Sequence, residues 1–188
     1  VIPKIYPISS PKQNSRQLIK AIKKLKSSQL DTFQYRRKKL NSLEVRKEID
    51  LVEKTCLLED IFLVLNSFHI EQLPKYYSGI HLTSDDLNKY KKRPISKDKI
   101  LGASCHNKRE ILMAESIQAD YIFLSPLKET NSHKTNKSIG WKRFRRLVLE
   151  TNIPVLALGG LQKEDLRIAQ TNGAYGIAGI RNFWPFNV

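Results

Sequence analysis

Two glycine-bearing segments near the carboxyl end of the chain have the composition of phosphate-binding turns. They are Ala157-Leu158-Gly159-Gly160 and Gly176-Ile177-Ala178-Gly179. In parallel α/β barrels the loops after the seventh and eighth strands commonly bind phosphate through backbone N–H groups, and glycine lets an anion approach that backbone. The same glycines would also serve as ordinary tight turns, so both interpretations stay open.

A polar row formed by Gln34, Arg36 and Lys38 follows a short apolar run, and strand alternation puts all three side chains on one side if the strand continues. Such a row suits a pyrophosphate, because Arg offers a planar fork and Lys a point charge. The run 36–39 is also typical of a basic turn or a nucleic-acid patch. Few aromatic residues suited to stacking on bases lie nearby, which makes nucleic acid an unlikely partner.

His81 alternates with the apolar residues Ile80 and Leu82, so its side chain is expected on the opposite face of a strand from theirs. Taken alone, this pattern is more typical of a structural histidine. Asp85 and Asp86 follow at the start of a predicted helix, where carboxylates are favoured by capping and by the helix dipole. One of them could also hold Mg²⁺, which prefers carboxylate and phosphate oxygens.

Short apolar runs alternate with amphipathic stretches along the whole chain, which is typical of a parallel sheet covered by helices. Eight strand and helix units fit one α/β domain over 1–188, a single (β/α)8 TIM barrel with parallel strands and short loops. The predicted strands are 2–8, 32–35, 61–65, 79–82, 100–104, 121–124, 155–158 and 176–179.

Local signals mark where some of the helices begin and end. Asn41 followed by Glu44 resembles a capping box, and Asn172-Gly173 is a typical stop before the eighth strand. Residues 73–77 are too few and too aromatic for a full helix, so one helix of the barrel is expected to be abbreviated. The polar stretch 128–139 follows the sixth strand, where such barrels place active-site loops, and fits either a lid or a solvated loop.

The composition limits the class of protein and its partners. A chain of 188 residues, 40% of them hydrophobic, suits one globular domain. The net charge of +15 favours anionic partners without identifying them. Cys56 and Cys105 lack the spacing of a zinc site, and no apolar run approaches a membrane span. A cytoplasmic protein with no membrane association is therefore expected.

Several motifs occur in an order that resembles the thiamine phosphate synthase and thiazole tautomerase family. The resemblance runs from about Ile5 to Trp184 and becomes stronger after Gly79. The segments that carry it are Gln34-Tyr35-Arg36-Arg37-Lys38, Gly79-Ile80-His81-Leu82 with Asp86, Gly102-Ala103-Ser104-Cys105-His106, Ala119-Asp120-Tyr121, Ser125-Pro126, Thr130-Asn131-Ser132-His133, and Pro154-Val155-Leu156-Ala157-Leu158-Gly159-Gly160.

In that family's synthases, a pyrimidine pyrophosphate loses pyrophosphate with the help of Mg²⁺, and the nitrogen of a thiazole phosphate captures the pyrimidine cation. The resemblance implies that the two phosphorylated substrates are this chain's partners and Mg²⁺ its cofactor. By position, it implies pyrophosphate contacts from Gln34, Arg36, Lys38 and Asn66, metal binding by Asp86, reacting ends at Ser104, Thr130 and Ser132, and a thiazole phosphate site at Gly159, Gly160 and Gly179.

Three departures from the family pattern concern this site. Ser67 stands where the family has a second metal-binding Asp. His133 stands where the loop lysine belongs, although Lys134 is adjacent and could substitute for it. Arg181 replaces a small hydroxyl residue after the eighth strand. With Ser125-Pro126, these changes resemble a divergent branch often fused behind a Nudix hydrolase domain.

Three functions are consistent with these residues. The first is a thiamine phosphate synthase, a transferase, with a rebuilt and weakened metal site. The second is a metal-free thiazole tautomerase, in which His81, His106 or His133 moves a proton. The third is a non-catalytic module that binds thiamine phosphates, motivated by the lost carboxylate at Ser67.

Overall fold

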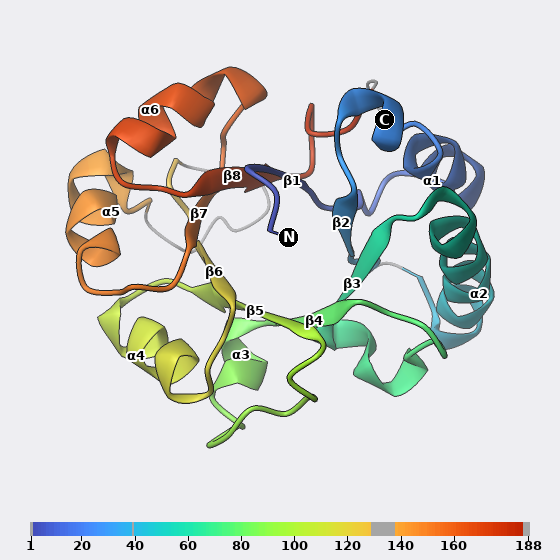
Figure 1. The fold of residues 1–188 in the computed structure, drawn as a ribbon, viewed down its shortest axis with the longest axis horizontal. Helices are drawn as coiled ribbons and strands as arrows, with labels where there is room; N and C mark the ends of the chain where they lie inside the picture. The colour runs from blue at the N-terminus through green and yellow to red at the C-terminus, as the bar shows by residue number, and fades with distance from the viewer. Residues whose placement is uncertain (1, 39, 129–137, 186–188) are drawn as a thin grey trace.

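The computed structural model describes residues 2–38, 40–128 and 138–185. Eight parallel strands form one sheet in the order β1-β8-β7-β6-β5-β4-β3-β2. Beyond β1, the Ser9 N–H donates to the Gln34 carbonyl at 2.9 Å and Ile8 forms a parallel bridge with Gln34. This contact joins the two edge strands into a nearly closed barrel, which confirms the predicted fold (Figure 1). The strands are β1 (Ile5–Pro7), β2 (Thr32–Tyr35), β3 (Phe62–Asn66), β4 (Gly79–Leu82), β5 (Ile100–Cys105), β6 (Tyr121–Leu124), β7 (Val155–Leu158) and β8 (Gly176–Gly179).

The helices cover the outer face of the barrel and differ greatly in length (Figure 1). Between β3 and β4 there is only the 3₁₀ turn Ser67–Gln72, which confirms the expected abbreviation. The helix between β4 and β5 is a single turn. Shortening at these two places is how eight units fit in 188 residues. The helices are α1 (Ser15–Ile22), α2 (Ser42–Glu59), α3 (Ser84–Leu87), α4 (Lys108–Ser116), α5 (Gly140–Val148) and α6 (Leu166–Thr171), with further 3₁₀ turns at Lys26–Ser28 and Lys163–Asp165.

The predicted helix signals are confirmed in the structure. The side chain of Asn41 accepts a hydrogen bond from the backbone N–H of Glu44, and the side chain of Glu44 accepts one from the backbone N–H of Asn41. Helix α2 therefore begins with a capping box. Helix α6 ends at Thr171, and Gly173 has φ +89°, a conformation that glycine adopts without strain. Strand β1 is shorter than the predicted first strand, 2–8. Pro3, which lies before it, has no N–H to donate, and Ile8, which follows it, forms only an isolated bridge.

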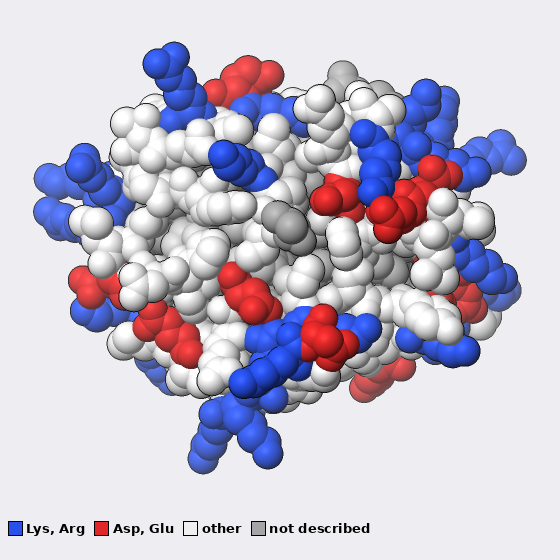
Figure 2. All heavy atoms as spheres, viewed as in Figure 1, with Lys and Arg blue, Asp and Glu red and all other residues white. Residues whose placement is uncertain are grey.

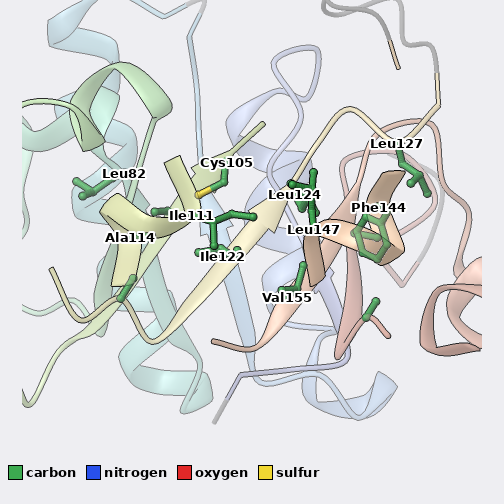
Figure 3. Packing of buried hydrophobic residues seen from close by; sticks show 14 of the residues in the cluster. Leu82, Cys105, Ile111, Ala114, Ile122, Leu124, Leu127, Phe144, Leu147 and Val155 are labelled. Carbon is green, nitrogen blue, oxygen red and sulfur yellow. The ribbon is translucent and has the colours of Figure 1, made fainter. Parts of the chain in front are cut away.

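Apolar side chains form layers on both faces of the strands. Between the strands and the outer helices, Ile111 and Ala114 of α4 and Phe144 and Leu147 of α5 pack against β5, β6 and β7 (Figure 3). A second layer joins α1 and α2 to β2 and β3. Inside the barrel, side chains from β1, β6, β7 and β8 form a separate buried cluster. Its members are Tyr6, Ile8, Tyr121, Phe123, Leu156 and Ala178.

Basic side chains are common on the face of the molecule that Figure 2 shows. Figure 2 shows Lys and Arg spread around the rim of one face, interrupted by Asp and Glu. This face therefore lacks the single continuous basic surface that is typical of nucleic-acid binding. Within the described ranges, the structure contains no helix that is both long and apolar enough to cross a membrane.

Candidate active site

Most of the predicted site residues lie at the carboxyl ends of the strands, where parallel barrels place their active sites. Gln34 and Asn66 lie in the last two positions of β2 and β3, His81 and Ser104 near the ends of β4 and β5, and Gly159 directly after β7. Parallel pairing of all these strands brings their ends to one mouth of the barrel. Thr130, Ser132, His133 and Lys134 lie outside the described residues.

The polar row continues from β2 into the mouth of the barrel. The side-chain amide of Asn66 donates to Oε1 of Gln34 at 3.1 Å, and both side chains are buried. The Nε2 group of Gln34 is also buried and has no hydrogen-bond partner among the described residues. A buried amide donor without a partner is costly, so this group is available for an acceptor such as a phosphate oxygen.

Arg36 and Lys38, which follow Gln34 in the chain, add two cations whose charges act on each other. Burial lowers the pKa of Lys38, and the neighbouring charge of Arg36 lowers it further, while Asp85 and Asp86 oppose the change. Burial likewise lowers the pKa of Arg36. Two partly desolvated cations that repel each other are stabilised when an anion binds between them. The polar row therefore has the electrostatics of an anion site.

Asp86 lies in the single turn after β4 and is held by three donors. Ser67 Oγ donates to its Oδ2 at 2.5 Å, Thr83 Oγ1 donates to the same oxygen at 2.9 Å, and Lys89 Nζ lies 2.6 Å from Oδ1. Burial alone would raise the pKa of Asp86, but the hydrogen bonds from Lys89, Ser67 and Thr83 outweigh it and hold the pKa below its usual value. The carboxylate is therefore ionised at neutral pH.

These residues can be compared with the needs of Mg²⁺. In the described part of the chain, no group of three or more His, Cys, Asp or Glu side chains could hold a metal ion. Ser67, which replaces a carboxylate in the family pattern, donates to Asp86 and so supports a single acidic ligand. Mg²⁺ is often bound by one carboxylate together with substrate phosphates and water. Asp86 can serve as that carboxylate if the metal replaces the Lys89 ammonium at Oδ1, since the Lys89 side chain is exposed.

His81 lies within a buried hydrogen-bonded chain inside the barrel. Its side chain faces the interior, whereas Ile80 and Leu82 pack in the outer layer, as alternation predicts. The Tyr6 and Tyr121 hydroxyls are 3.0 Å apart, Tyr121 OH is 3.1 Å from His81 Nδ1, and His81 Nε2 is 2.9 Å from Ser104 Oγ. Burial, and secondarily the charge of Arg36, lowers the pKa of His81 to about 3, so the imidazole is neutral at physiological pH.

The chain can be protonated in two orders. If Tyr6 donates to Tyr121, Tyr121 to His81 and His81 to Ser104, each of these donors has an acceptor and the Ser104 hydroxyl proton is free. In the reverse order the buried Tyr6 hydroxyl has no acceptor among the described residues. Because a buried donor without an acceptor is costly, the first order is favoured. Ser104 then has a proton to donate to a ligand at the barrel mouth.

Gly102 makes room for this chain. A Cβ atom built on Gly102 would lie 2.5 Å from Tyr121 Oη and 2.6 Å from His81 Nδ1. Gly102 and Tyr121 were placed in family motifs from the sequence, but neither residue was connected there with Tyr6 or His81. The available signal was a tyrosine in each of two predicted strands, β1 and β6. Only the barrel geometry shows that their hydroxyl groups meet in the interior.

His106 lies just beyond β5 with one ring nitrogen held by backbone. Its Nδ1 lies 2.6 Å from the carbonyl oxygen of Ser125. Because a carbonyl only accepts, Nδ1 carries the proton and donates to it. In the neutral ring Nε2 is then an unprotonated acceptor on a half-buried side chain. His106 is separate from the buried chain around His81.

The glycine turn, Gly159-Gly160, has a backbone conformation that most residues avoid. Gly159 has φ +112° and Gly160 has φ +67°. A Cβ on Gly159 would lie 2.9 Å from Leu127 N. Within the described part of the chain, the N–H groups of Gly160 and Leu161 donate to no protein acceptor. The turn therefore combines a structural need for glycine with two donors available to an anion.

Gly179, the third predicted phosphate glycine, has a packing role of its own. A Cβ there would lie 2.3 Å from the ring of Phe183, which is fully buried. The geometry thus explains this glycine without a ligand. Its predicted phosphate contact stays a prediction.

Comparison with known proteins agrees with this fold and these strand-end motifs. Residues 5–183 match the family described as thiamine monophosphate synthase. A protein of Aquifex aeolicus with the provisional name thiamine-phosphate synthase 2 is 30% identical over 182 residues, which cover 97% of this chain and 98% of that protein. A thiamine-phosphate synthase of Prochlorococcus marinus is 30% identical over 176 residues, 93% of this chain, and the match spans only 49% of that longer protein.

A solved structure supports the same fold. The thiamine phosphate pyrophosphorylase from Pyrococcus furiosus superimposes with a TM-score of 0.72 at 23% identity, covering 94% of this chain and 85% of that one. The family match extends over nearly the whole barrel and includes both the polar row and the glycine turn. The chain therefore belongs to the thiamine monophosphate synthase family.

Proposed function

We propose that this chain joins a pyrimidine pyrophosphate to a thiazole phosphate and releases pyrophosphate. The observation that carries the proposal is the group formed by two partly buried cations, the ionised Asp86 and the buried Gln34 amide, whose Nε2 has no partner in the described part of the chain. The glycine turn follows β7, three strands from β2 around the barrel, and two of its N–H groups donate to no acceptor among the described residues, so they could contact a second phosphate. Two separate anion sites at one mouth match two phosphorylated substrates.

The proposed reaction assigns distinct tasks to these residues. As the bond from the pyrimidine carbon to the pyrophosphate oxygen breaks, Arg36, Lys38 and the amides of Gln34 and Asn66 stabilise the growing negative charge. Asp86 is the residue that would hold Mg²⁺, whose positive charge further offsets that of the departing pyrophosphate. Ser104 donates its proton to a substrate oxygen, and the glycine turn orients the thiazole phosphate so that the ring nitrogen attacks the pyrimidine carbon.

A reconstituted reaction tests the proposal. The purified chain is incubated with both phosphorylated precursors and MgCl₂, and thiamine phosphate and released pyrophosphate are measured by chromatography. We expect both products in equal amounts, and much less of each from Arg36→Gln. Tight binding of the precursors without turnover would instead support the non-catalytic module.

His106 is the observation that favours a second candidate, the metal-free thiazole tautomerase. His106 directly follows the carboxyl end of β5, and the Ser125 carbonyl fixes its ring orientation through Nδ1, which leaves Nε2 as the acceptor of the neutral ring. A base held in this way is suited to moving a proton on a bound thiazole carboxylate phosphate. Turnover of that substrate in the presence of a chelator, lost in His106→Asn, would favour this function over the synthase.

Two finer assignments are part of the proposal. We place the chain in the divergent branch that is often fused to Nudix hydrolases, because of Ser67, Ser125-Pro126 and Arg181. We also place it in the cytoplasm. The genomic neighbourhood, searched for a Nudix domain or thiamine genes, tests the first assignment, and fractionation of cells tests the second.

A further inference from the structure

Residues 36–38, between β2 and α2, point their side chains to alternate sides. The charges of Arg36 and Lys38 act on each other, and the charge of Arg36 also acts on His81 inside the barrel. Arg37 turns away from the mouth and is buried against α2. The basic run in the sequence is therefore divided between two environments.

Arg37 and Glu48 form a fully hydrogen-bonded buried pair. Arg37 Nε lies 2.9 Å from Glu48 Oε2 and Arg37 Nη2 lies 3.2 Å from Oε1, while Nη1 donates to the Ser10 carbonyl. Glu48 also accepts from Tyr35 OH at 2.7 Å and from Ser15 Oγ at 2.6 Å. The pair thus joins the end of β2 to α2, to the start of α1 and to the loop after β1.

The backbone of the same segment is held from two other sides. Ser9 Oγ accepts from the N–H of Arg36 at 2.7 Å and lies 3.2 Å from its carbonyl oxygen. The N–H of Arg37 donates to Nε2 of His69 at 2.9 Å. Burial and the charge of Arg36 lower the pKa of His69 to about 4, so this nitrogen remains an acceptor at neutral pH. Both peptide groups that flank the Arg36 side chain are therefore fixed.

We infer that Arg37 and Glu48 are positioning residues of the anion site, which hold Arg36 and Lys38 in place without contacting the substrate. This inference rests on the proposed function. A buried ion pair is weak evidence for stability, because well-packed apolar residues often replace one at no cost. The pair has a specific geometric consequence, because it fixes Arg37, and the residues directly before and after Arg37 are the two cations of the polar row. Misplacing such groups by about 1 Å can cost about 100-fold in rate.

Two variants distinguish a positioning role of the Arg37–Glu48 pair from a direct effect of its charge and from an effect on folding stability. Arg37→Lys keeps a positive charge beside Glu48 but loses the planar fork that makes two contacts with it. The double variant Arg37→Met with Glu48→Leu removes the pair and leaves no unpaired buried charge. Arg46→Ala is the matched control, because Arg46 forms an exposed pair with Asp50 on the same helix.

The readouts are calorimetric binding of inorganic pyrophosphate with MgCl₂, the thermal unfolding midpoint, and KM for each substrate. In both variants at positions 37 and 48, we expect pyrophosphate affinity to fall about 10-fold or more while the protein stays folded. KM should rise for the pyrimidine pyrophosphate and stay within about 2-fold for the thiazole phosphate, since the glycine turn is untouched. Arg46→Ala should match the unaltered protein in all three.

Wild-type pyrophosphate affinity in folded Arg37→Lys protein would overturn the inference, and this variant decides the matter if the double variant fails to fold. The proposed function can fail separately. If the unaltered chain makes no thiamine phosphate but binds pyrophosphate, and the variants bind it more weakly, the reaction is wrong and the positioning role stands. If the reaction proceeds and the variants bind normally, only the positioning role is wrong.

Discussion

The two proposed anion sites at the barrel mouth are built from different parts of the chain. The polar row uses side chains, and its cations depend on a buried pair, a serine and a histidine that hold the segment between β2 and α2. The glycine turn uses backbone N–H groups and depends on two positive φ angles. The first site is therefore sensitive to charge and to supporting side chains, and the second to any side chain placed on the turn.

This difference determines which changes, of pH or of sequence, should disturb each site. Charges in the polar row act over several ångströms, and the charge of Arg36 contributes to the lowered pKa values of both His69 and His81. Backbone N–H groups carry no net charge and do not titrate. Changes of pH should therefore act on the region around the polar row and leave the glycine turn unaffected. A side chain added at Gly159 or Gly160 should disturb the glycine turn and leave the polar row unaffected.

Acid should have the largest effect on the region around the polar row. The pKa values of His81 and His69 are lowered to about 3 and about 4, whereas unfolded histidine titrates near 6.5. Above that value neither state is charged, and as pH falls toward 4 the unfolded chain binds protons that the folded chain does not. Stability should then fall by about 1 kcal/mol per pH unit for each histidine.

Denaturant unfolding at a series of pH values between 7 and 4.5 measures this loss. His81→Gln should remove roughly half of the slope, since one of the two buried histidines no longer takes up a proton. An equal slope in the variant and in the unaltered protein would show that His81 is not a buried neutral group.

Gly159→Ala should be the most damaging single substitution in the glycine turn. Gly159 has φ +112°, and the added Cβ would lie 2.9 Å from Leu127 N. Backbone strain and the clash together should lower the free energy of unfolding by about 3 kcal/mol. Thermal unfolding measures this loss. Gly140→Ala is a useful comparison, because Gly140 has φ +63° but a Cβ there would have no neighbour within 4 Å among the described residues.

Most of the fold could be predicted from the sequence. All eight strands were expected within a few residues of their bounds, because each is a short apolar run flanked by polar or turn residues. The capping box at Asn41 and the short segment before Gly79 were also identified. Local spacing could not give the closure between Ile8 and Gln34, since that contact joins two strands far apart in the chain.

The site was only partly predictable for the same reason. Alternation placed Gln34, Arg36 and Lys38 on one side and His81 on the inner face. It also implied that Arg37 points the other way, but its partner Glu48 is found only once α2 is packed on β2. Glu48 falls between the core residues Val45 and Val52 of α2, and an acidic residue in an apolar stripe was the available signal. The Tyr6 and Tyr121 contact likewise needs the closed barrel.

Arg36→Gln should test the polar row with a large effect on binding and little effect on folding. The variant loses one cation that lies beside another, so repulsion of Lys38 is relieved and stability should be kept. A charge-assisted hydrogen bond to phosphate is worth about 2 to 3 kcal/mol, so pyrophosphate affinity should fall about 100-fold. Calorimetry measures it, and a loss below about 2-fold would exclude Arg36 from the anion site.

Gly160→Asp should give the smallest and most selective effect. Gly160 has φ +67°, a conformation that Asp and Asn tolerate better than other side chains, so both variants should fold. The Asp carboxylate would repel a bound phosphate, whereas the Asn amide has nearly the same shape and no charge. Affinity for the thiazole phosphate should therefore fall about 10-fold more in Gly160→Asp than in Gly160→Asn at low salt, and the gap should narrow as salt is added. Pyrophosphate affinity at the polar row should be equal in the two variants. If Asp and Asn weaken thiazole phosphate binding equally, the turn acts by shape alone and the free N–H groups of Gly160 and Leu161 do not face the anion.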